Sequence, residues 1–531
     1  MQEAQKVSMH NDTLPECLRG KVIIADGAVY YSNDIPEDDH ELRAVISYAR
    51  RKGIEDTKPL PTKDFARFYN ENSKAVSESE VQEMGKNLIQ TAHEAGASDI
   101  HIADHGSFST IRTRNLGMME DSGTLPAKVG EDLIRTIYNT MTQGADSSFS
   151  ETERQDGRMK REYLPKEVHS VRVHTEPIQS LMASGDKGTF MALRLLYDIT
   201  GVSGSLEERF TALGYLPEHI AIFRYLSNRS GMTIFSGPTG SGKTTAYKHY
   251  LESGADENRD KAFMSIEDPP EYPMERVNQV HVGGQTHDSF KRAIEGAMRS
   301  DPDFIGIGEI RNGLTALAAL DAAQTGHSLL TSIHASSALD IISRLAGLLS
   351  EAGKDHPREL ICDHSVCAGL VHQRLVPILC PECKMPLTEY RDMDRNNIMR
   401  RKNLPEPVLK RLLKAVDMKN RMESIYIRGE GCEYCNNKGF HKQTVVAEVI
   451  ATDHALLTHL RNNDFSSAHK HWTEEQNGKS FVQHAIQLIE DGQLDPLETE
   501  KKLGLPLNYD KVFSNYRLTA SDLEQISGQG N

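Results

Sequence analysis

The sequence lacks long apolar segments and is poor in cysteine. No apolar run approaches the roughly 20 residues that a membrane-spanning helix needs. The N-terminal stretch MQEAQKVSMHNDTLPECL has no apolar centre of the kind found in signal peptides. Seven cysteines in 531 residues, without the spacing of a disulfide framework, are typical of a reducing compartment. We therefore expect a cytoplasmic protein.

Basic residues are fewer than acidic ones. Lys and Arg total 61 against 76 Asp and Glu, which gives a formal net charge of −15. A protein that coats nucleic acid usually carries a basic stripe, so this balance argues against a nucleic-acid partner. Hydrophobic residues make up 38% of the chain, enough for packed cores, and the length predicts about three domains.

The stretch FSGPTGSGKTT at 235–245 fits the phosphate-loop pattern G-x-x-x-x-G-K-[ST]. It follows the apolar run MTIF, which predicts a buried strand, and precedes TAYKHYL, which predicts a helix. This context favours a nucleotide site over a glycine-rich turn that binds nothing. Lys243 would reach the β- and γ-phosphates, and the Thr244 hydroxyl would ligate Mg²⁺. The expected nucleotide-binding residues are Gly237, Pro238, Thr239, Gly240, Ser241, Gly242, Lys243, Thr244 and Thr245.

Two later strands are expected to end in carboxylates. KAFMSIEDPPEY delivers Glu267 and Asp268, and SDPDFIGIGEIRN delivers Glu309. Ligands bind at the C-terminal ends of parallel strands, and a carboxylate there can polarise the attacking water or contact Mg²⁺ through water. The pattern favours the water role for Glu309. Which of Glu267 and Glu309 is the main water-activating residue stays open.

The strand-like run SLLTSI has His327 before it and His334 after it. A histidine at a strand tip can donate a hydrogen bond to a γ-phosphate and so report its presence. The alternative is a histidine that only stabilises the fold.

Two C-x-x-C pairs, CPEC at 380–383 and CEYC at 432–435, lie 48 residues apart (432 − 383 − 1). Four thiolates in two such pairs can close on one tetrahedral Zn²⁺. We expect a zinc site made of Cys380, Cys383, Cys432 and Cys435, the alternative being four reduced thiols. The other cysteines, Cys17, Cys362 and Cys367, have no partner at metal-ligand spacing.

Periodicity divides the rest of the chain. We expect a strand pair around Asp26-Gly27 and a helix over 38–53. Further on, a helix over 79–96 and strands over 97–104, 157–164, 169–178 and 188–199 predict a compact α+β domain. Helices over 206–213 and 217–228 then lead into alternating strands and helices, which predict a parallel α/β sheet. The expected domains are an N-terminal extension of uncertain fold (1–76), the α+β domain (77–203), a linker (204–215), the α/β domain (216–505) with the zinc module (376–446), and a polar tail (506–531).

These motifs, in this order, resemble those of the secretion ATPases of type II secretion and type IV pilus systems. GPTGSGKTT is similar to the Walker A box of that family, SIEDPPEY to its Asp box, SDPDFIGIGEIRN to its Walker B box and QTGHSLLTSIHASSALDIISRL to its His box. Upstream, ASDIHI at 97–102 and RQDGR at 154–158 resemble segments of its N-terminal domain. The resemblance covers about residues 77–500.

The resemblance implies a PAS-like N-terminal domain, a flexible linker and a RecA-like ATPase domain, assembled as a homo-hexamer. It implies ATP, Mg²⁺ and Zn²⁺ as ligands, and catalytic roles for Glu267, Glu309 and His334. It also implies that arginines from the N-terminal domain complete the site, at the positions Arg158, Arg172 and Arg194. Such a motor would act on an inner-membrane platform protein and attach to the cytoplasmic face of that membrane through its partners. In this family the tetracysteine module favours pilus assembly or protein export over pilus retraction.

The sequence departs from the family pattern at Glu295, where arginine is common, and at Asn312, where aspartate is usual. Lys442, Gln443 and Val445 replace an expected Gly, Arg and Gly. These departures resemble the type IVb or conjugative-pilus branch. The alternatives are a retraction motor, a non-hydrolysing nucleotide-dependent scaffold and a DNA translocase, the last disfavoured by the negative charge.

Overall fold

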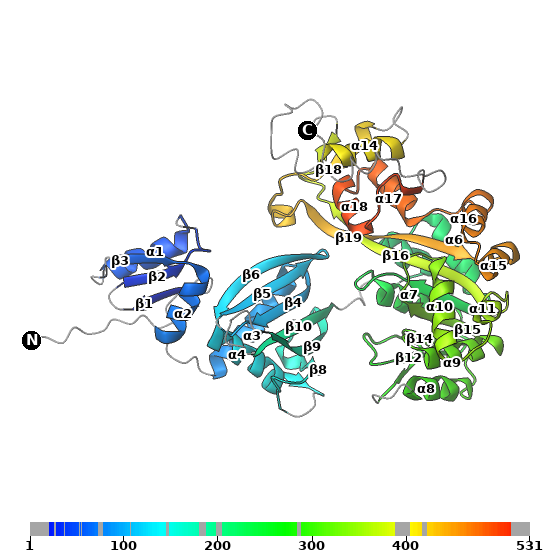
Figure 1. The fold of residues 1–531 in the computed structure, drawn as a ribbon, viewed down its shortest axis with the longest axis horizontal. Helices are drawn as coiled ribbons and strands as arrows, with labels where there is room; N and C mark the ends of the chain where they lie inside the picture. The colour runs from blue at the N-terminus through cyan, green and yellow to red at the C-terminus, as the bar shows by residue number, and fades with distance from the viewer. Residues whose placement is uncertain are drawn as a thin grey trace, which may run out of the picture. The chain divides into compact units, whose positions relative to one another are not determined.

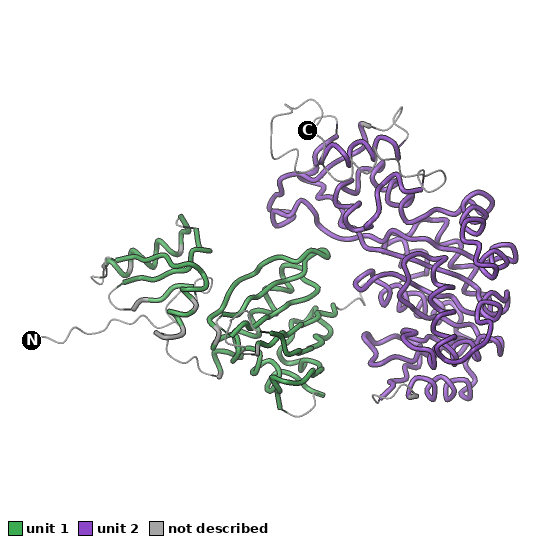
Figure 2. Tube along the Cα trace, viewed as in Figure 1, with its two compact units in different colours: residues 1–198 green, residues 199–531 purple. Residues whose placement is uncertain are grey.

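The computed structural model describes residues 21–510 except 26–27, 37, 52–53, 55, 73–77, 107, 145–147, 180–186, 198–203, 284–287, 388–403 and 417–421. The chain forms two compact units, residues 1–198 and residues 199–531 (Figure 2). The expected turn at Asp26-Gly27 and most of the expected polar tail lie outside the described residues. The division into five named domains stays a prediction.

Unit 1 begins with a small three-stranded sheet of order β1-β2-β3. The expected strand pair is present and antiparallel, and β2 pairs with β3 in parallel after crossing over through α1, the helix that the sequence predicts. Leu42, Val45 and Ala49 of α1 are buried against Val29 and Tyr31 of β2. The elements are β1 (Val22–Ala25), β2 (Ala28–Ser32), α1 (His40–Arg51), β3 (Asp56–Leu60) and α2 (Thr62–Asn72).

The rest of unit 1 is an antiparallel seven-stranded sheet of order β6-β5-β4-β10-β9-β8-β7 (Figure 1). Helices α3 and α4 cover one face, where Val173 and Leu193 are fully buried. Residues between the buried ones, such as Arg172 and Arg194, point to the other face, as the two-residue period of a strand requires. The elements are α3 (Glu78–Glu94), β4 (Ala97–Asp104), β5 (Phe108–Asn115), β6 (Met118–Pro126), α4 (Ala127–Thr136), a π-helical turn (Ile137–Met141), β7 (Thr142–Gln143), β8 (Gln155–Met159), a 3₁₀ turn (Arg161–Tyr163), β9 (Val168–Gln179) and β10 (Lys187–Tyr197).

One expected strand is wrong in part. The predicted strand over 157–164 ends at Met159, and Arg161–Tyr163 form a 3₁₀ turn. In that turn the Arg161 guanidinium donates to the carbonyl oxygens of Pro165, Lys166 and Val168 and closes the chain on itself. The sequence pattern also did not predict β5 and β6. The edge strand β6 reads MMEDSGTLP and buries only Pro126, so it lacks the apolar alternation that identifies a strand.

Unit 2 is an α/β fold, as the sequence predicts. Its seven-stranded sheet has the order β13-β12-β14-β15-β11-β16-β19, parallel throughout except for the last pair. The strands are β11 (Gly231–Ser236), β12 (Phe263–Glu267), β13 (Val277–His281), β14 (Phe304–Ile307), β15 (Ser328–Ile333), β16 (Cys367–Leu379) and β19 (Phe440–Ala451).

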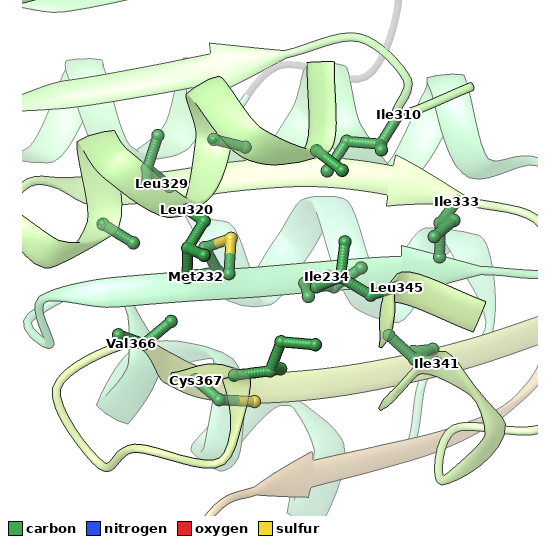
Figure 3. Packing of buried hydrophobic residues seen from close by; sticks show 14 of the residues in the cluster. Met232, Ile234, Ile310, Leu320, Leu329, Ile333, Ile341, Leu345, Val366 and Cys367 are labelled. Carbon is green, nitrogen blue, oxygen red and sulfur yellow. The ribbon is translucent and has the colours of Figure 1, made fainter. Parts of the chain in front are cut away.

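Helices cover both faces of this sheet, so inner strands such as β11 and β14 are buried along their whole length. Met232 and Ile234 of β11 pack in the cluster that contains α9 and α10 (Figure 3), whereas Phe235 packs with α6 and α7 on the opposite face. The helices are α5 (Leu206–Leu213), α6 (Pro217–Leu226), α7 (Lys243–Glu257), α8 (Asp288–Met298), α9 (Gly313–Gln324), α10 (Asp340–Glu351), α11 (Pro357–Ile361), α15 (His454–Arg461), α16 (Phe465–Lys470), α17 (Phe481–Glu490) and α18 (Pro496–Leu503).

The long antiparallel strands β16 and β19 lead away from the parallel sheet and carry the two C-x-x-C pairs at their far ends (Figure 1). The segment between them contains β17 (Met385–Pro386), α14 (Glu406–Ala415) and β18 (Tyr426–Ile427). These elements share a hydrophobic cluster with α17 and α18. Within the described residues no helix is long and apolar enough to cross a bilayer.

Candidate active site

The phosphate loop lies where the central strand β11 ends and α7 begins. Gly240 and Gly242 have φ angles of +75° and +81°, a conformation that strains any residue with a side chain. Since α7 begins at Lys243, the N–H groups of its first turn have no acceptor within the helix and carry the positive end of its dipole. This arrangement fits a phosphate chain.

Lys243 lies over the loop. Its Nζ donates to the carbonyl oxygens of Gly237, at 2.7 Å, and Pro238, at 3.1 Å. Burial lowers the pKa of Lys243 from its ordinary value, and the nearby Glu309 opposes the change. A partly desolvated ammonium interacts strongly with an anion, because less water screens its charge.

Glu309 and His334 meet at the same edge of the sheet. Glu309 follows β14 and His334 follows β15, and His334 Nε2 lies 2.9 Å from Glu309 Oε1. The other ring nitrogen, Nδ1, lies 3.0 Å from the Gly237 carbonyl oxygen. The two ring nitrogens therefore contact the carboxylate and the loop carbonyl at the same time. His334 thus joins Glu309 to the phosphate loop.

The backbone around Glu309 is fixed on both sides. The Gly308 N–H donates to Ile266 O of β12, and the Ile310 N–H donates to Ser332 O of β15. Arg311 Nε donates to Glu309 Oε2 at 2.7 Å, which makes an ion pair. Glu309 therefore has one carboxylate oxygen on the Arg311 guanidinium and the other on the His334 ring.

Glu267 is at the end of β12 and is buried. Its Oε1 accepts from Ser265 Oγ at 2.8 Å and from Gln279 Nε2 at 3.1 Å. Burial raises the pKa of Glu267, and the two hydrogen bonds oppose the change. Its Cγ lies beside Gly308, where a Cβ would come within 3.4 Å of it. Glu267 thus neighbours the Glu309 loop and is held by side chains of its own strand and of β13.

His327 precedes β15 and so lies at the opposite end of that strand from His334. Its Nδ1 lies 2.8 Å from Thr325 Oγ1, within the turn after α9. Asn312, one of the departures from the family pattern, caps α9: its Oδ1 accepts from the Thr315 N–H at 2.9 Å. Aspartate caps helices in the same way, so this substitution keeps the local structure.

The three arginines that the resemblance assigns to the site, Arg158, Arg172 and Arg194, are aligned across neighbouring strands of unit 1. Arg158 of β8 is opposite Arg172 of β9, which is opposite Arg194 of β10. Asp99 of β4 continues the row and accepts from Arg194 Nε at 2.9 Å. On its other side Arg114 Nε lies 3.5 Å from Asp99 Oδ2. The phosphate loop belongs to unit 2.

The four cysteines of the two C-x-x-C pairs converge. Cys380 and Cys432 sulfurs lie 3.7 Å apart, Cys383 and Cys435 sulfurs 3.9 Å, and Cys432 and Cys435 sulfurs 3.8 Å. Burial raises the pKa of the Cys435 thiol, but N–H donors from Cys432 and Gly439 outweigh this and lower it to about 6. Sulfur ligands in this arrangement fit Zn²⁺, and among the described residues they form the one cluster of this kind.

Two polar residues of β16 that the motifs did not predict, His372 and Gln373, face the phosphate loop. The Oγ of Ser236, the last residue of β11, lies 3.0 Å from His372 Nδ1. Gln373 Nε2 donates to Ser241 O at 2.7 Å. Both β16 residues are fully buried. The signal available in the sequence was the polar run HQR within the apolar stretch LVHQRLVPIL.

Known proteins resemble the chain along most of its length. The profile of the type II/IV secretion system protein family matches residues 74–505. The type II secretion system ATPase E of Vibrio cholerae is 29% identical over 371 residues, which cover 70% of this chain and 65% of that protein. The type IV pilus assembly ATPase PilB of Thermus thermophilus is 29% identical over 387 residues, which cover 72% of this chain and 39% of that protein. The matched region thus spans less than two thirds of either relative.

Among solved structures, that of the Legionella pneumophila ATPase DotB aligns with a TM-score of 0.51 at 18% sequence identity, covering 80% of this chain and 95% of that one. Identity at this level supports the fold alone. The family profile, in contrast, covers most of the sequence and extends over parts of both units. The chain therefore belongs to the type II/IV secretion system protein family, the family that the order of its motifs predicts.

Proposed function

We propose that this protein is an ATP-hydrolysing motor that powers type IV pilus assembly or a type II-like protein export. One observation carries the proposal. Lys243 and His334 both contact the Gly237 carbonyl oxygen of the phosphate loop, and Glu309 contacts the other ring nitrogen of the same histidine. Cationic donors and a carboxylate at the C-terminal edge of a parallel sheet are what phosphoryl transfer to water needs.

In this proposal the loop residues 237–245 bind the phosphates through backbone N–H groups, and Lys243 moves its ammonium from the Gly237 carbonyl to a phosphate oxygen. The Thr244 hydroxyl would hold Mg²⁺, which when bound neutralises charge on the β- and γ-phosphates. His334 donates to the γ-phosphate from the nitrogen that now faces Gly237. The same movement would loosen its contact with Glu309.

Glu309 orients the attacking water and accepts its proton. It is held by Arg311 on one carboxylate oxygen and by His334 on the other, so its carboxylate is fixed in position before the reaction begins. Glu267 is buried and engaged by Ser265 and Gln279, which suits a role in shaping the site and in holding metal-bound water. This division of roles makes Glu309 the main water-activating residue.

The proposed assembly is a homo-hexamer, in which Arg158, Arg172 and Arg194 neutralise charge on the phosphates. Their alignment across β8, β9 and β10 supports the idea, since three guanidinium groups then share one face of the sheet. The motor would work at the cytoplasmic face of the inner membrane, held there by a platform protein and other partners. ATP-driven movement between the units would move that platform protein.

The cluster of Cys380, Cys383, Cys432 and Cys435 favours assembly or export over retraction, because the resemblance places such a module in the assembly and export branch. Measuring pili in a deletion strain separates the alternatives. Absence of pili supports an assembly motor, whereas abundant pili that no longer retract support a retraction motor.

ATP hydrolysis by the purified protein is the direct test. Lys243→Ala should abolish turnover, because the phosphate loop loses its cation. Lys261→Ala is the matched control, since Lys261 is exposed just before β12. Equal turnover by both variants and the parent would refute the nucleotide assignment. Binding of ATP by the parent without turnover would favour the scaffold alternative.

A further inference from the structure

Gln373 of β16 touches the phosphate loop at both ends. Its side-chain Nε2 donates to the Ser241 carbonyl oxygen at 2.7 Å. Its backbone oxygen lies against Gly237, where an added Cβ would come within 2.4 Å of it. Near the end of the loop, an added Cβ at Gly242 would lie 3.3 Å from Gln373 Nε2. Both ends of the loop therefore lie against this one fully buried residue.

Tyr215 fixes the orientation of the Gln373 amide. The Tyr215 hydroxyl donates to Gln373 Oε1 at 2.5 Å. The Ser241 carbonyl only accepts, so the amide nitrogen must face the loop and the amide oxygen must face Tyr215. Complete burial raises the pKa of Tyr215, which therefore keeps its hydrogen and donates it. Tyr215 itself packs between Phe210 and Phe223.

These contacts determine which way the loop presents its backbone. The C=O of Ser241 and the N–H of Gly242 belong to one planar trans peptide and point in opposite directions. Because Gln373 holds the Ser241 carbonyl on its own side, the Gly242 N–H points away from β16. A phosphate loop binds through N–H groups aimed at its ligand, so the direction of this peptide matters for affinity.

We propose that Gln373 is a positioning residue for nucleotide binding, holding the phosphate loop in its anion-binding shape, and that Tyr215 orients it. The inference rests on the proposed function, since it concerns the same nucleotide site. Gln373 acts through Ser241 and Gly242 and touches no nucleotide itself. Its loss should weaken binding of ground and transition state alike, which raises KM and leaves kcat nearly unchanged.

The test is Gln373→Glu, which keeps the shape of the side chain and removes the donor to Ser241. Loss of a buried hydrogen bond of this kind should weaken binding of a fluorescent ADP analogue about tenfold at pH 8. At lower pH the introduced carboxyl gains a proton and can donate again, so the defect should shrink between pH 8 and pH 6. The other titratable and charged groups near Gln373 and the loop include Tyr215, Lys243, Glu267, Glu309, His334, His372, Arg374 and, on the neighbouring strand β19, Glu448. They are present in both proteins, so the ratio of the two affinities at each pH reports the introduced group.

A second variant covers the case in which Gln373→Glu does not fold. Tyr215→Phe removes only the hydroxyl that orients the amide and should weaken ADP binding about threefold. Tyr250→Phe is the matched control, because the Tyr250 hydroxyl donates to Phe223 O at 3.3 Å in the same aromatic cluster and does not contact the loop. The control should bind ADP as the parent does.

The outcomes separate the two ideas. Parent-like ADP binding by Gln373→Glu at pH 8, or equal losses in Tyr215→Phe and Tyr250→Phe, would overturn the positioning role. A loss that persists unchanged at pH 6 would also overturn it, because a merely structural defect does not depend on the protonation of the new carboxyl. If the parent binds no nucleotide at all, the proposed function itself fails.

Discussion

Replacing Cys383 by Ser should release the metal of the tetracysteine cluster while leaving the nucleotide site intact. In a tetrahedral site with zinc–sulfur bonds of about 2.3 Å, the sulfurs are about 3.8 Å apart. The sulfur distances of 3.7, 3.8 and 3.9 Å match that value. A disulfide would need about 2.05 Å, so the arrangement fits a shared metal better than a covalent bond.

The size of the effect follows from the number of ligands. Structural zinc sites in small domains bind with about 10–16 kcal/mol. An equal share for each of four thiolates is about 3 kcal/mol, so loss of Cys383 should weaken zinc binding about 100-fold or more. A metal held by these cysteines would also connect the ends of a segment whose described residues form α14, two short strands and two 3₁₀ turns. Its loss should therefore loosen the segment locally.

Zinc content by elemental analysis and competition with a coloured chelator measure the binding, and hydrogen exchange over 404–440 measures the loosening. Cys362→Ser is the matched control, since Cys362 is a buried cysteine outside the cluster and should keep full zinc. ADP binding should survive in both variants, because the cysteines belong to a different part of unit 2 from the phosphate loop. The reasoning would be refuted by a metal-replete parent with less than about one-tenth equivalent of zinc and four free thiols.

Three further predictions concern the active site and the core. Glu309→Gln should still bind ATP while turnover falls about 100-fold, as measured by phosphate release; loss of binding would assign Glu309 to the metal instead. His334→Ala should uncouple nucleotide binding from movement between the units, so a variant that still assembles pili normally would reduce His334 to a structural residue. Burial lowers the pKa of His219 to about 4 and that of His484 to about 3, so both are neutral in the folded protein. Their contribution is complete above pH 6.5 and is lost as pH falls, by about 2 kcal/mol each at pH 5, so the melting temperature of the parent should fall more steeply between pH 7 and 5 than that of His484→Gln.

The local features of unit 2 were predictable from the sequence. Each of β11, β12, β14 and β15 is a short, largely apolar run followed by a polar residue or a glycine. Because parallel strands share one edge for their C-terminal ends, Lys243, Glu309 and His334 could be expected together. In the structure Lys243 and His334 both contact the Gly237 carbonyl oxygen, and His334 also contacts Glu309.

Relations that depend on strand register were not predictable. Gln373 faces the phosphate loop only because β16 pairs with β11, with Val371 opposite Phe235 although they are 136 residues apart. Nothing local in the run HQR indicates that partner. The same holds for Asp99, which contacts Arg194 because β4 lies beside β10. Strands β5 and β6 lack an apolar alternation, because the buried positions of β5 are mostly polar, such as Ser109, Thr113 and Asn115, and β6 buries only Pro126.

The Gly237 carbonyl oxygen explains how the site can be ordered before any ligand arrives. The Lys243 ammonium donates to this oxygen and His334 Nδ1 lies 3.0 Å from it, so one acceptor holds both side chains beside the loop. An arriving phosphate carries far more negative charge than a carbonyl and competes for both donors at once. His334 also contacts Glu309, so its transfer to the phosphate would change the hydrogen bonding of the carboxylate that orients water. In the proposed motor, phosphate binding and preparation of the water would then be one event, which is why replacing His334 should affect coupling more than affinity.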